Sequence, residues 1–181
     1  MAITGTEGVG KSRFLEEMMG QWGGTLVDPG RPDQIDPAAQ GPWAVDDAHR
    51  ATPIELFTVI NQAIADRRPL LLSGEGRPAL WVSDPTAPGA PDLSSRLNAV
   101  PAVALDAPDA ETMEKALMLA LHGVGLHLPE AAVRHAVAQL YRRFTVIEPI
   151  VRSAVRISPS IAAPKPLLDA AIADNPEHCL T

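Results

Sequence analysis

The sequence predicts a three-layer α/β/α domain with a parallel sheet, followed by a small all-α domain. Short apolar runs alternate with helical patterns from the N-terminus to Leu105, which is typical of a parallel sheet covered by helices on both faces. From Asp109 onward the apolar spacing is helical throughout. We therefore expect a boundary near Pro108, with residues 1–108 as the α/β core and residues 109–181 as the helical domain.

Five short apolar segments are the expected strands. They cover residues 1–4, 24–27, 43–46, 70–73 and 102–105. All-apolar runs of this length fit strands that are buried on both faces of a parallel sheet. Prolines gather in residues 29–42 and 78–91, so we expect loops there.

Helical spacing of apolar residues predicts the other elements. We expect helices at 11–20, 53–68, 92–98, 110–123, 129–143, 146–156 and 166–173. The apolar side of the first helix is expected to contain Phe14, Leu15 and Met18. The second helix is expected to bury a stripe made of Ile54, Phe57, Ile60 and Ile64.

Composition limits the classes of function. The chain has 181 residues and a formal net charge of −7. Its longest basic runs are two arginine pairs, 67–68 and 142–143, each on an expected helix. Because proteins that bind nucleic acid directly usually display a basic stripe, we do not expect such binding.

Sequence features also indicate the cellular compartment of the protein. The single cysteine, Cys179, excludes a disulfide within the chain and suits a reducing compartment. No apolar run approaches the roughly 20 residues that cross a membrane. The N-terminus shows no signal-peptide pattern. We expect a cytoplasmic protein without a membrane partner.

A glycine-rich loop separates the first expected strand from the first helix. Residues 5–12 read Gly-Thr-Glu-Gly-Val-Gly-Lys-Ser, which matches the phosphate-binding pattern Gly-x4-Gly-Lys-Ser. Glycines let several backbone N–H groups approach phosphate at the start of a helix. The expected nucleotide-binding residues are Gly5, Thr6, Glu7, Gly8, Val9, Gly10, Lys11 and Ser12. Lys11 would contact the β- and γ-phosphates, and the Ser12 hydroxyl would bind Mg²⁺. The alternative is a glycine-rich turn with an exposed lysine.

Two carboxylates follow the third expected strand. In this position Asp46 would orient Mg²⁺ through water, and Asp47 would activate the water that attacks phosphate. The alternative is a helix cap or a surface turn. Ser73 ends the fourth expected strand, where it would either sense the γ-phosphate or open the turn that follows. Arg96 would either stabilise phosphate charge on a neighbouring subunit or be a solvated helix residue.

The order and spacing of these segments resemble the AAA+ ATPases related to the replication initiator DnaA. The segments are the glycine-rich loop, Val-Asp-Asp-Ala-His-Arg at 45–50, Leu-Leu-Leu-Ser at 70–73, Pro-Asp-Leu-Ser-Ser-Arg-Leu at 91–97 and the helical region. Within that group, residues 104–109 followed by residues 126–133 are similar to the short Hda-type regulators. The resemblance spans nearly the whole chain, although only the glycine-rich loop is a sharply specific motif.

The resemblance implies an AAA+ core and lid that bind ATP or ADP with Mg²⁺ and lack a DNA-binding domain. It also implies association with the sliding clamp and negative regulation of replication initiation, by promoting hydrolysis of the ATP bound to a DnaA-type initiator. Arg96 matches the arginine of the family's Ser-Arg motif, which contacts nucleotide across a subunit interface, so the resemblance also implies a homo-oligomer.

The chain departs from the family in two places. Family members carry several tens of residues before the loop, including the clamp-binding peptide, so we expect either a chain that is truncated at its N-terminus or a reading frame that starts too late. The lid arginine of the family falls near Thr145, where Arg142 or Arg143 would have to replace it.

Two other functions fit the same loop. One is a small-molecule or nucleotide kinase, which would need a lid closing over a second substrate pocket; the purely helical tail argues against it. The other is a non-enzymatic interaction protein with a decayed nucleotide site. ATP hydrolysis by the isolated chain is expected to be weak, because the arginine would come from another subunit.

Overall fold

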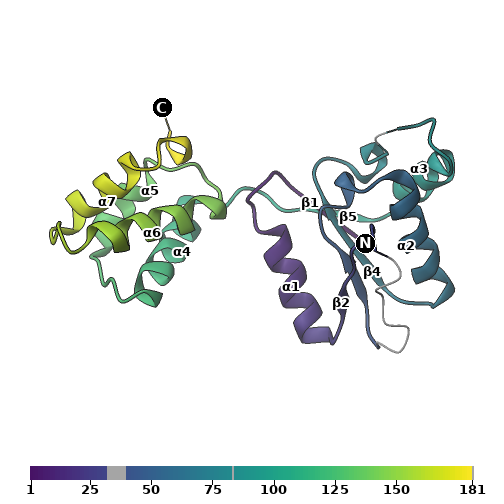
Figure 1. Ribbon diagram of the computed structural model, residues 1–181, viewed down its shortest axis with the longest axis horizontal. Coiled ribbons are helices and arrows are strands. Elements are labelled where there is room, and N and C mark those ends of the chain that lie inside the picture. The colour runs from purple at the N-terminus through teal and green to yellow at the C-terminus, as the bar shows by residue number, and fades with distance from the viewer. Residues whose placement is uncertain (32–39, 83, 181) are drawn as a thin grey trace. The chain divides into compact units, whose positions relative to one another are not determined.

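The protein consists of two compact units, Met1–Asp106 and Ala107–Thr181. A computed structural model describes residues 1–31, 40–82 and 84–180 (Figure 1). In this part of the chain, the first unit contains a parallel five-stranded sheet with helices, and the second unit is built from helices. The predicted fold class, a parallel α/β core followed by a helical region, is confirmed.

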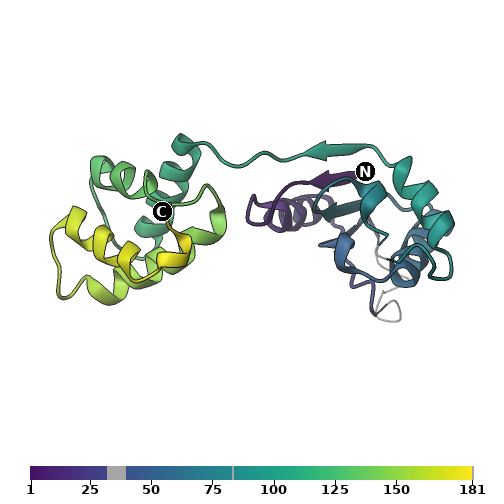
Figure 2. The ribbon, with the colours of Figure 1, turned by 90° about the horizontal axis from the view of Figure 1, so that it is seen from above.

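The sheet has the strand order β2-β3-β4-β1-β5 in the described residues, and all of its pairs are parallel. The strands are β1 (Ala2–Thr4), β2 (Thr25–Leu26), β3 (Trp43–Val45), β4 (Leu70–Gly74) and β5 (Ala102–Ala104). β1 lies between β4 and β5, with Ile3 opposite Ser73 on one side and Val103 on the other. Figure 2 shows β1 and β5 side by side and pointing in the same direction. Their carboxyl ends therefore meet at one edge of the sheet.

Helix α1 (Lys11–Trp22) covers one face of the sheet (Figure 1). The side chains that form this layer of the core are Ile3, Leu15, Met19, Ala44 and Leu71. The predicted apolar side of α1 was only partly right: Leu15 is buried, but Phe14 is 37% exposed and Met19 takes its place in the core.

Helices α2 (Pro53–Ala65) and α3 (Ala90–Asn98) cover the opposite face. α2 begins at a capping box, in which Thr52 and Glu55 bond each other's backbone N–H groups. Its buried residues are Pro53, Leu56, Val59, Ile60 and Ala63. The predicted stripe was therefore wrong at its ends, since Ile54 and Ile64 are 56% and 59% exposed. The helix is apolar on several sides, and packing against the sheet selects the buried one.

The connections of the first unit differ from the predictions in detail. The loop expected at 29–42 lies largely outside the described residues. The loop expected at 78–91 contains a short 3-10 helix, Pro78–Leu80. α2 ends at Ala65, so Arg67 and Arg68 lie in the turn before β4 rather than on the helix, and Arg67 has a φ of 52°.

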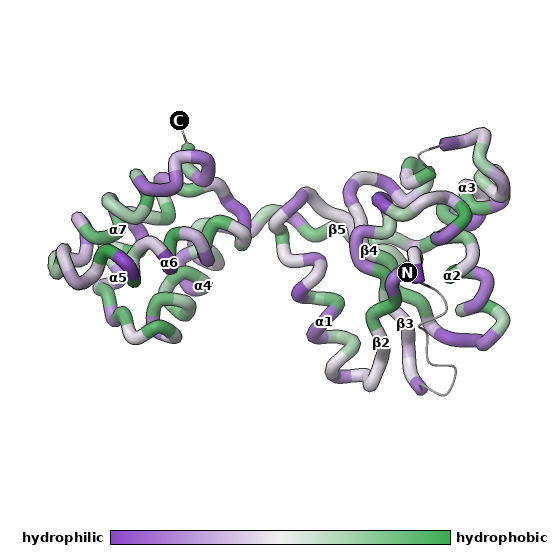
Figure 3. Tube along the Cα trace, viewed as in Figure 1, coloured by the Kyte–Doolittle hydropathy of each residue, from purple (hydrophilic) through white to green (hydrophobic). Residues whose placement is uncertain are grey.

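The second unit contains α4 (Ala110–Gly123), α5 (Glu130–Val137), α6 (Ile147–Ile157) and α7 (Pro164–Ala173). Figure 3 shows hydrophobic and hydrophilic residues alternating along these helices, as expected for elements with one buried side. The largest fully buried side chains of this unit are Met113, Leu117, Leu121, Leu140 and Ile150. No helix in the described residues is long and apolar enough to cross a membrane.

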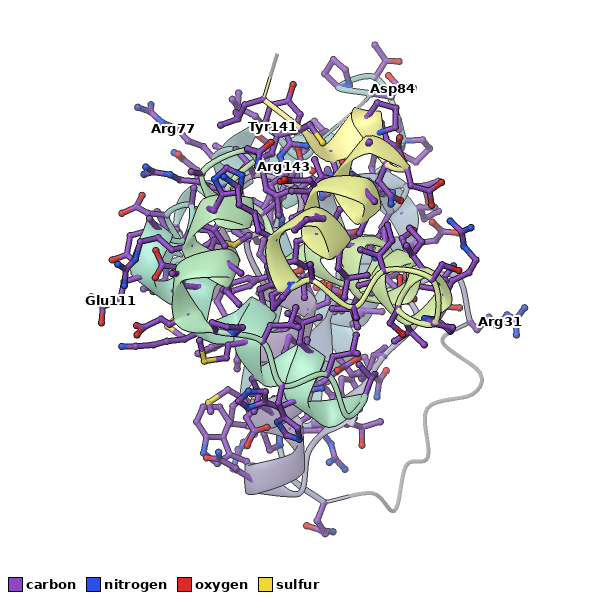
Figure 4. The ribbon with its side chains drawn as sticks, turned by 90° about the vertical axis from the view of Figure 1, so that its left-hand side faces the viewer. Arg31, Arg77, Asp84, Glu111, Tyr141 and Arg143 are labelled. Atoms are coloured by element: carbon purple, nitrogen blue, oxygen red, sulfur yellow. The ribbon has the colours of Figure 1, made fainter. Side chains whose placement is uncertain are left out.

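α5 ends at Val137, six residues before the predicted end at Arg143. The chain leaves the helix because Leu140 forms an antiparallel bridge with Cys179, and the Tyr141 N–H donates to the His178 carbonyl at 3.0 Å. Arg142 and Arg143 therefore lie outside α5. The Arg143 guanidinium lies 5.7 Å from the centre of the Tyr141 ring, and the two side chains are neighbours in Figure 4. Thr145 lies in a short 3-10 helix, Phe144–Val146.

The aromatic residues are divided unequally between the units. All three tryptophans, Trp22, Trp43 and Trp81, belong to the α/β unit, whereas the single tyrosine, Tyr141, belongs to the helical unit. Trp43 and Trp81 are buried, and Trp22 is exposed.

Candidate functional site

Three neighbouring strands end at the candidate site. β1 leads directly into the glycine-rich loop, and the Gly5 N–H donates to the Gly74 carbonyl at the end of β4 at 3.3 Å. β3 lies on the other side of β4, so Asp46, the residue after β3, is placed beside Ser73. The sheet order therefore brings together the loop, Ser73 and Asp46, which are far apart in the sequence. Ligands of parallel α/β proteins bind at this carboxyl edge.

The loop has a backbone that requires glycine. Gly8 and Gly10 have φ values of 79° and 101°, in the left-handed region that other residues rarely adopt. A Cβ on Gly5 would lie 2.7 Å from the Leu105 carbonyl oxygen, so no larger residue fits there. The Val9 side chain is buried beneath the loop. These features hold the backbone in a concave turn whose N–H groups are available to an anion.

Helix α1 begins immediately after the loop, at Lys11. The Phe14 N–H makes the first intrahelical bond, to the Gly10 carbonyl at 2.9 Å. No described side chain caps this end of the helix. The first N–H groups and the positive end of the helix dipole are therefore directed toward the loop, as in anion sites at helix N-termini.

The Lys11 side chain is almost completely buried, at 6% exposure. Its Nζ donates to the Gly5 and Thr6 carbonyls at 2.9 and 3.0 Å, so the side chain folds back across the loop. An ammonium group has three donors, and one remains for a ligand. A cation is thus fixed at the centre of the loop. Ser12, on the first turn of α1, is exposed, as are Thr6 and Glu7.

Asp46 and Ser73 form a hydrogen-bonded pair at the ends of β3 and β4. Ser73 is fully buried, and its hydroxyl donates to Asp46 Oδ1. The Asp47 N–H donates to Asp46 Oδ1 at 3.1 Å and to Ser73 Oγ at 3.0 Å. Ser73 therefore lies within β4 and orients a carboxylate. The second Asp46 oxygen stays available for an aqueous cation.

Asp47 follows with an unusual backbone. Its φ of 48° is left-handed, which costs a non-glycine residue about 1 kcal/mol or more and occurs often at functional sites. Asp47 Oδ2 lies 3.6 Å from Arg50 Nε, and Oδ1 lies 4.0 Å from His49 Nδ1. The side chain is 41% exposed, so these neighbours restrain it without burying it.

The predicted residue Arg96 lies elsewhere in the α/β unit. It is on α3, with its guanidinium 5.4 Å from the centre of the Phe57 ring of α2. It lines a cavity together with Met1 and Leu70, the residues at the amino ends of β1 and β4. The loop occupies the opposite ends of these strands. Arg96 is therefore not part of the group formed by the loop, Asp46, Asp47 and Ser73.

Sequence reasoning missed several residues that shape the site. Trp81 packs against the end of β4, where a Cβ on Gly74 would lie 2.4 Å from its ring, and Trp81 Nε1 donates to the Glu75 carbonyl at 2.6 Å. Arg50 and His49 restrain Asp47. Asp47 and Arg50 are three residues apart in a turn, and this spacing could have indicated that they form a pair. No pattern in the nearby sequence indicates that Trp81 packs at the site.

The groups at this edge fit a magnesium-bound nucleoside triphosphate. The loop offers backbone donors and one buried ammonium to phosphate oxygens. The Ser12 hydroxyl and the Asp46 carboxylate are the hard oxygen ligands that Mg²⁺ prefers, directly or through water.

Comparison with known proteins finds no match by sequence, but it finds solved structures that have a similar fold. No protein-family model matches the sequence, and no curated protein matches it. The Thermotoga maritima RuvB Holliday junction branch migration motor matches with a TM-score of 0.69 and 14% identity, over 96% of this chain and 60% of RuvB. Domain III of the T. maritima replication initiation protein DnaA matches with a TM-score of 0.69 and 14% identity, over 100% of this chain and 85% of the domain. A replication initiator DnaA bound to AMPPCP and single-stranded DNA matches with a TM-score of 0.61 and 17% identity, over 88% of this chain and 55% of that one.

The fold is therefore that of the AAA+ P-loop ATPases. The chain is similar in fold to RuvB and to domain III of DnaA, and it spans only about 60% of the RuvB chain. At 14–17% identity, these similarities show the fold alone and do not show an activity or a partner.

Proposed function

We propose that this chain is an adenine-nucleotide-binding AAA+ module that regulates DNA replication initiation through protein contacts. The observation that carries the nucleotide-binding part is the position of Lys11, whose buried ammonium is fixed in a glycine loop beside the Asp46–Ser73 pair. A buried cation with one donor left over is costly unless an anion completes its surroundings. The DnaA structure with AMPPCP is a neighbour with the same fold.

Each residue has a distinct role in this proposal. The N–H groups of residues 6–12 and the Lys11 ammonium bind the phosphates, while the Gly5 N–H is used by the Gly74 carbonyl. Ser12 and Asp46 hold Mg²⁺, which neutralises phosphate charge, and Ser73 keeps the Asp46 carboxylate in place. Asp47 is positioned to accept a proton from an attacking water, but Arg50 and His49 lie against its oxygens. Hydrolysis by the chain alone should therefore be slow.

The regulatory part of the proposal concerns a DnaA-type initiator. The resemblance of the sequence motifs to Hda-type regulators and the likeness of the fold to DnaA domain III support it. Arg96 lies away from the chain's own loop, at the amino end of the sheet, so it is available to a nucleotide held by another subunit. In this role, Arg96 would stabilise the phosphate charge that develops as the initiator hydrolyses its ATP.

Calorimetric titration with Mg·ATP and Mg·ADP tests the nucleotide site. Lys11→Ala should weaken binding about 100-fold, because it removes a charge-assisted contact to phosphate. Arg13→Ala is the matched control, since Arg13 is an exposed cation two residues further along α1 and should leave the affinity unchanged. Equal affinities for the wild type and Lys11→Ala would show that the loop does not bind nucleotide.

Release of phosphate from ATP-loaded initiator tests the regulatory role. Addition of this chain should accelerate hydrolysis, and Arg96→Ala should remove the acceleration while leaving the chain's own nucleotide affinity intact. Unchanged acceleration with Arg96→Ala would reject the role of this residue. Absence of any acceleration by the wild-type chain would reject action on DnaA and leave the nucleotide site untouched.

A further inference from the structure

A cavity of about 250 Å³ opens at the amino end of the sheet, within the α/β unit. It lies among the starts of β1 and β4 and the carboxyl-terminal parts of α2 and α3. The residues that line it are Met1, Ile60, Ala63, Ile64, Arg68, Leu70, Leu72, Arg96 and Val100. The glycine loop leaves β1 at its other end, so this cavity is separate from the proposed nucleotide site.

The cavity has an apolar floor and an apolar rim. Ile60, Ala63 and Leu72 are buried and form part of the hydrophobic core behind it. At the rim, Ile64 is 59% exposed. A concave site with apolar walls and few polar groups is the usual form of a small-ligand pocket. A ligand that covered the rim would remove this apolar surface from water.

The charges that line the cavity are of one sign. Among the described residues that line it, Arg68 and Arg96 have the ionisable side chains, and none has a carboxylate. This is unusual for a chain with a formal net charge of −7. An apolar pocket edged by cations complements a ligand that has an apolar body and an anionic head.

Both guanidinium groups are held in position by aromatic rings. Arg96 lies over Phe57 at 5.4 Å, and Arg68 lies over Trp43 at 5.2 Å. Arg68 Nη1 also donates to the Gly41 carbonyl at 3.3 Å. Stacking restricts the side chain, so less rotamer entropy is lost when a guanidinium binds a carboxylate. Arg96 has no such backbone contact in the described residues, and it is the arginine better placed for a ligand.

We propose that this cavity binds a small amphiphilic carboxylate, namely an unbranched aliphatic acid of medium length. The cavity volume of about 250 Å³ is comparable to that of a medium-length aliphatic chain, and it is too small for a large ring system. The chain would lie against Ile60, Ala63 and Leu72. The carboxylate would receive the N–H donors of Arg96, a pairing that planar guanidinium groups favour.

Octanoate is the probe that tests this site, in a calorimetric or NMR titration of the whole chain. Two molecules of the same length, 1-octanol and octylammonium, control for the head group. Octanoate should bind at least about tenfold more tightly than either, because only its head is an anion that accepts charge-assisted hydrogen bonds from a guanidinium, whereas the octanol hydroxyl is a neutral acceptor and the ammonium only donates. Equal binding of octanoate and 1-octanol would overturn the proposal, as would no binding of octanoate.

Variants locate the binding. Arg96→Gln should weaken octanoate about tenfold, whereas Arg77→Gln should not, because Arg77 is exposed and its side chain points into solvent (Figure 4). Val100→Phe, a larger residue at the half-buried wall, should also weaken octanoate and covers the case in which Arg96→Gln unfolds. Unchanged affinity in the folded variants would overturn the proposal. Lys11→Ala should bind octanoate normally, so failure of the nucleotide site and failure of this site are distinguishable.

Discussion

The two units differ in what their buried polar side chains do. Among the described residues, the α/β unit buries Lys11 and Ser73, and the helical unit buries Ser153 and Asn175. Lys11 and Ser73 lie at the edge of the sheet, bonded to loop carbonyls and to a carboxylate that faces outward. Ser153 and Asn175 bond each other at 2.9 Å, between α6 and the end of α7.

The helical pair is satisfied within the fold. Asn175 Nδ2 donates to the Ala171 carbonyl at 2.8 Å as well as to Ser153 Oγ, and Ser153 Oγ donates to Asp174 at 2.7 Å. These bonds cap the carboxyl end of α7, where helix carbonyls lack hydrogen-bond partners within the helix. The pair in the α/β unit keeps capacity for a ligand. The buried polar groups thus satisfy one another within the fold in the helical unit, whereas in the α/β unit they lie in the proposed nucleotide site.

Asn175→Ala should give the largest change in stability. It removes two hydrogen bonds from a buried amide, so we expect the helical unit to lose about 2–3 kcal/mol of unfolding free energy. Urea unfolding followed by circular dichroism measures this loss. Nucleotide affinity should be unchanged. A loss of nucleotide affinity in folded Asn175→Ala would mean that the buried polar groups of the helical unit also influence nucleotide binding.

The same substitution in both units sharpens the comparison. Ser153→Ala and Ser73→Ala each remove a buried hydroxyl and should each cost about 1 kcal/mol of stability. Only Ser73→Ala should also weaken Mg²⁺-dependent ATP binding, about tenfold, because Asp46 loses the donor that orients it. Titrations with and without Mg²⁺ separate this effect from a general loss of affinity. Equal nucleotide binding by the two variants would contradict the role assigned to Ser73.

The smallest expected effect concerns pH. Hydrogen bonds from Ser153, and then from Arg156, hold the pKa of Asp174 below its ordinary value of 3.8. The stability that these bonds provide is therefore present above that value and is lost as the pH falls through the lower pKa of the folded state. Asp174→Asn should flatten the acid limb of the stability curve measured from neutral pH to about pH 2. Identical acid limbs in the variant and the wild type would contradict this assignment.

Much of the α/β unit could be predicted from local patterns. The strands, the glycine loop and the acidic pair after β3 have short signatures, and the parallel order then places Asp46 beside Ser73. The buried side of α2 could not be predicted, because apolar residues surround this helix. Only contact with the sheet and α3 selects Leu56, Val59 and Ala63 over Ile54 and Ile64.

The end of α5 shows a second limit. Nothing in residues 138–143 breaks a helix, and the predicted helix ran on to Arg143. The chain turns because Leu140 pairs with Cys179, a residue near the other end of the unit. Such a contact appears only when the whole unit is folded. The restraint of Asp47 by Arg50 and His49 was missed for a similar reason, since it depends on a left-handed backbone at Asp47.

The unequal division of aromatic residues has an optical consequence. Because all three tryptophans lie in the α/β unit, indole fluorescence reports on that unit alone, and the helical unit contributes no tryptophan emission. Trp43 and Trp81 leave their buried surroundings when the sheet unfolds, so their emission should move to longer wavelength. The far-ultraviolet signal, in contrast, contains the helices of both units. The native chain therefore carries its own pair of probes, and any difference between the two melting curves would reveal that the units unfold separately.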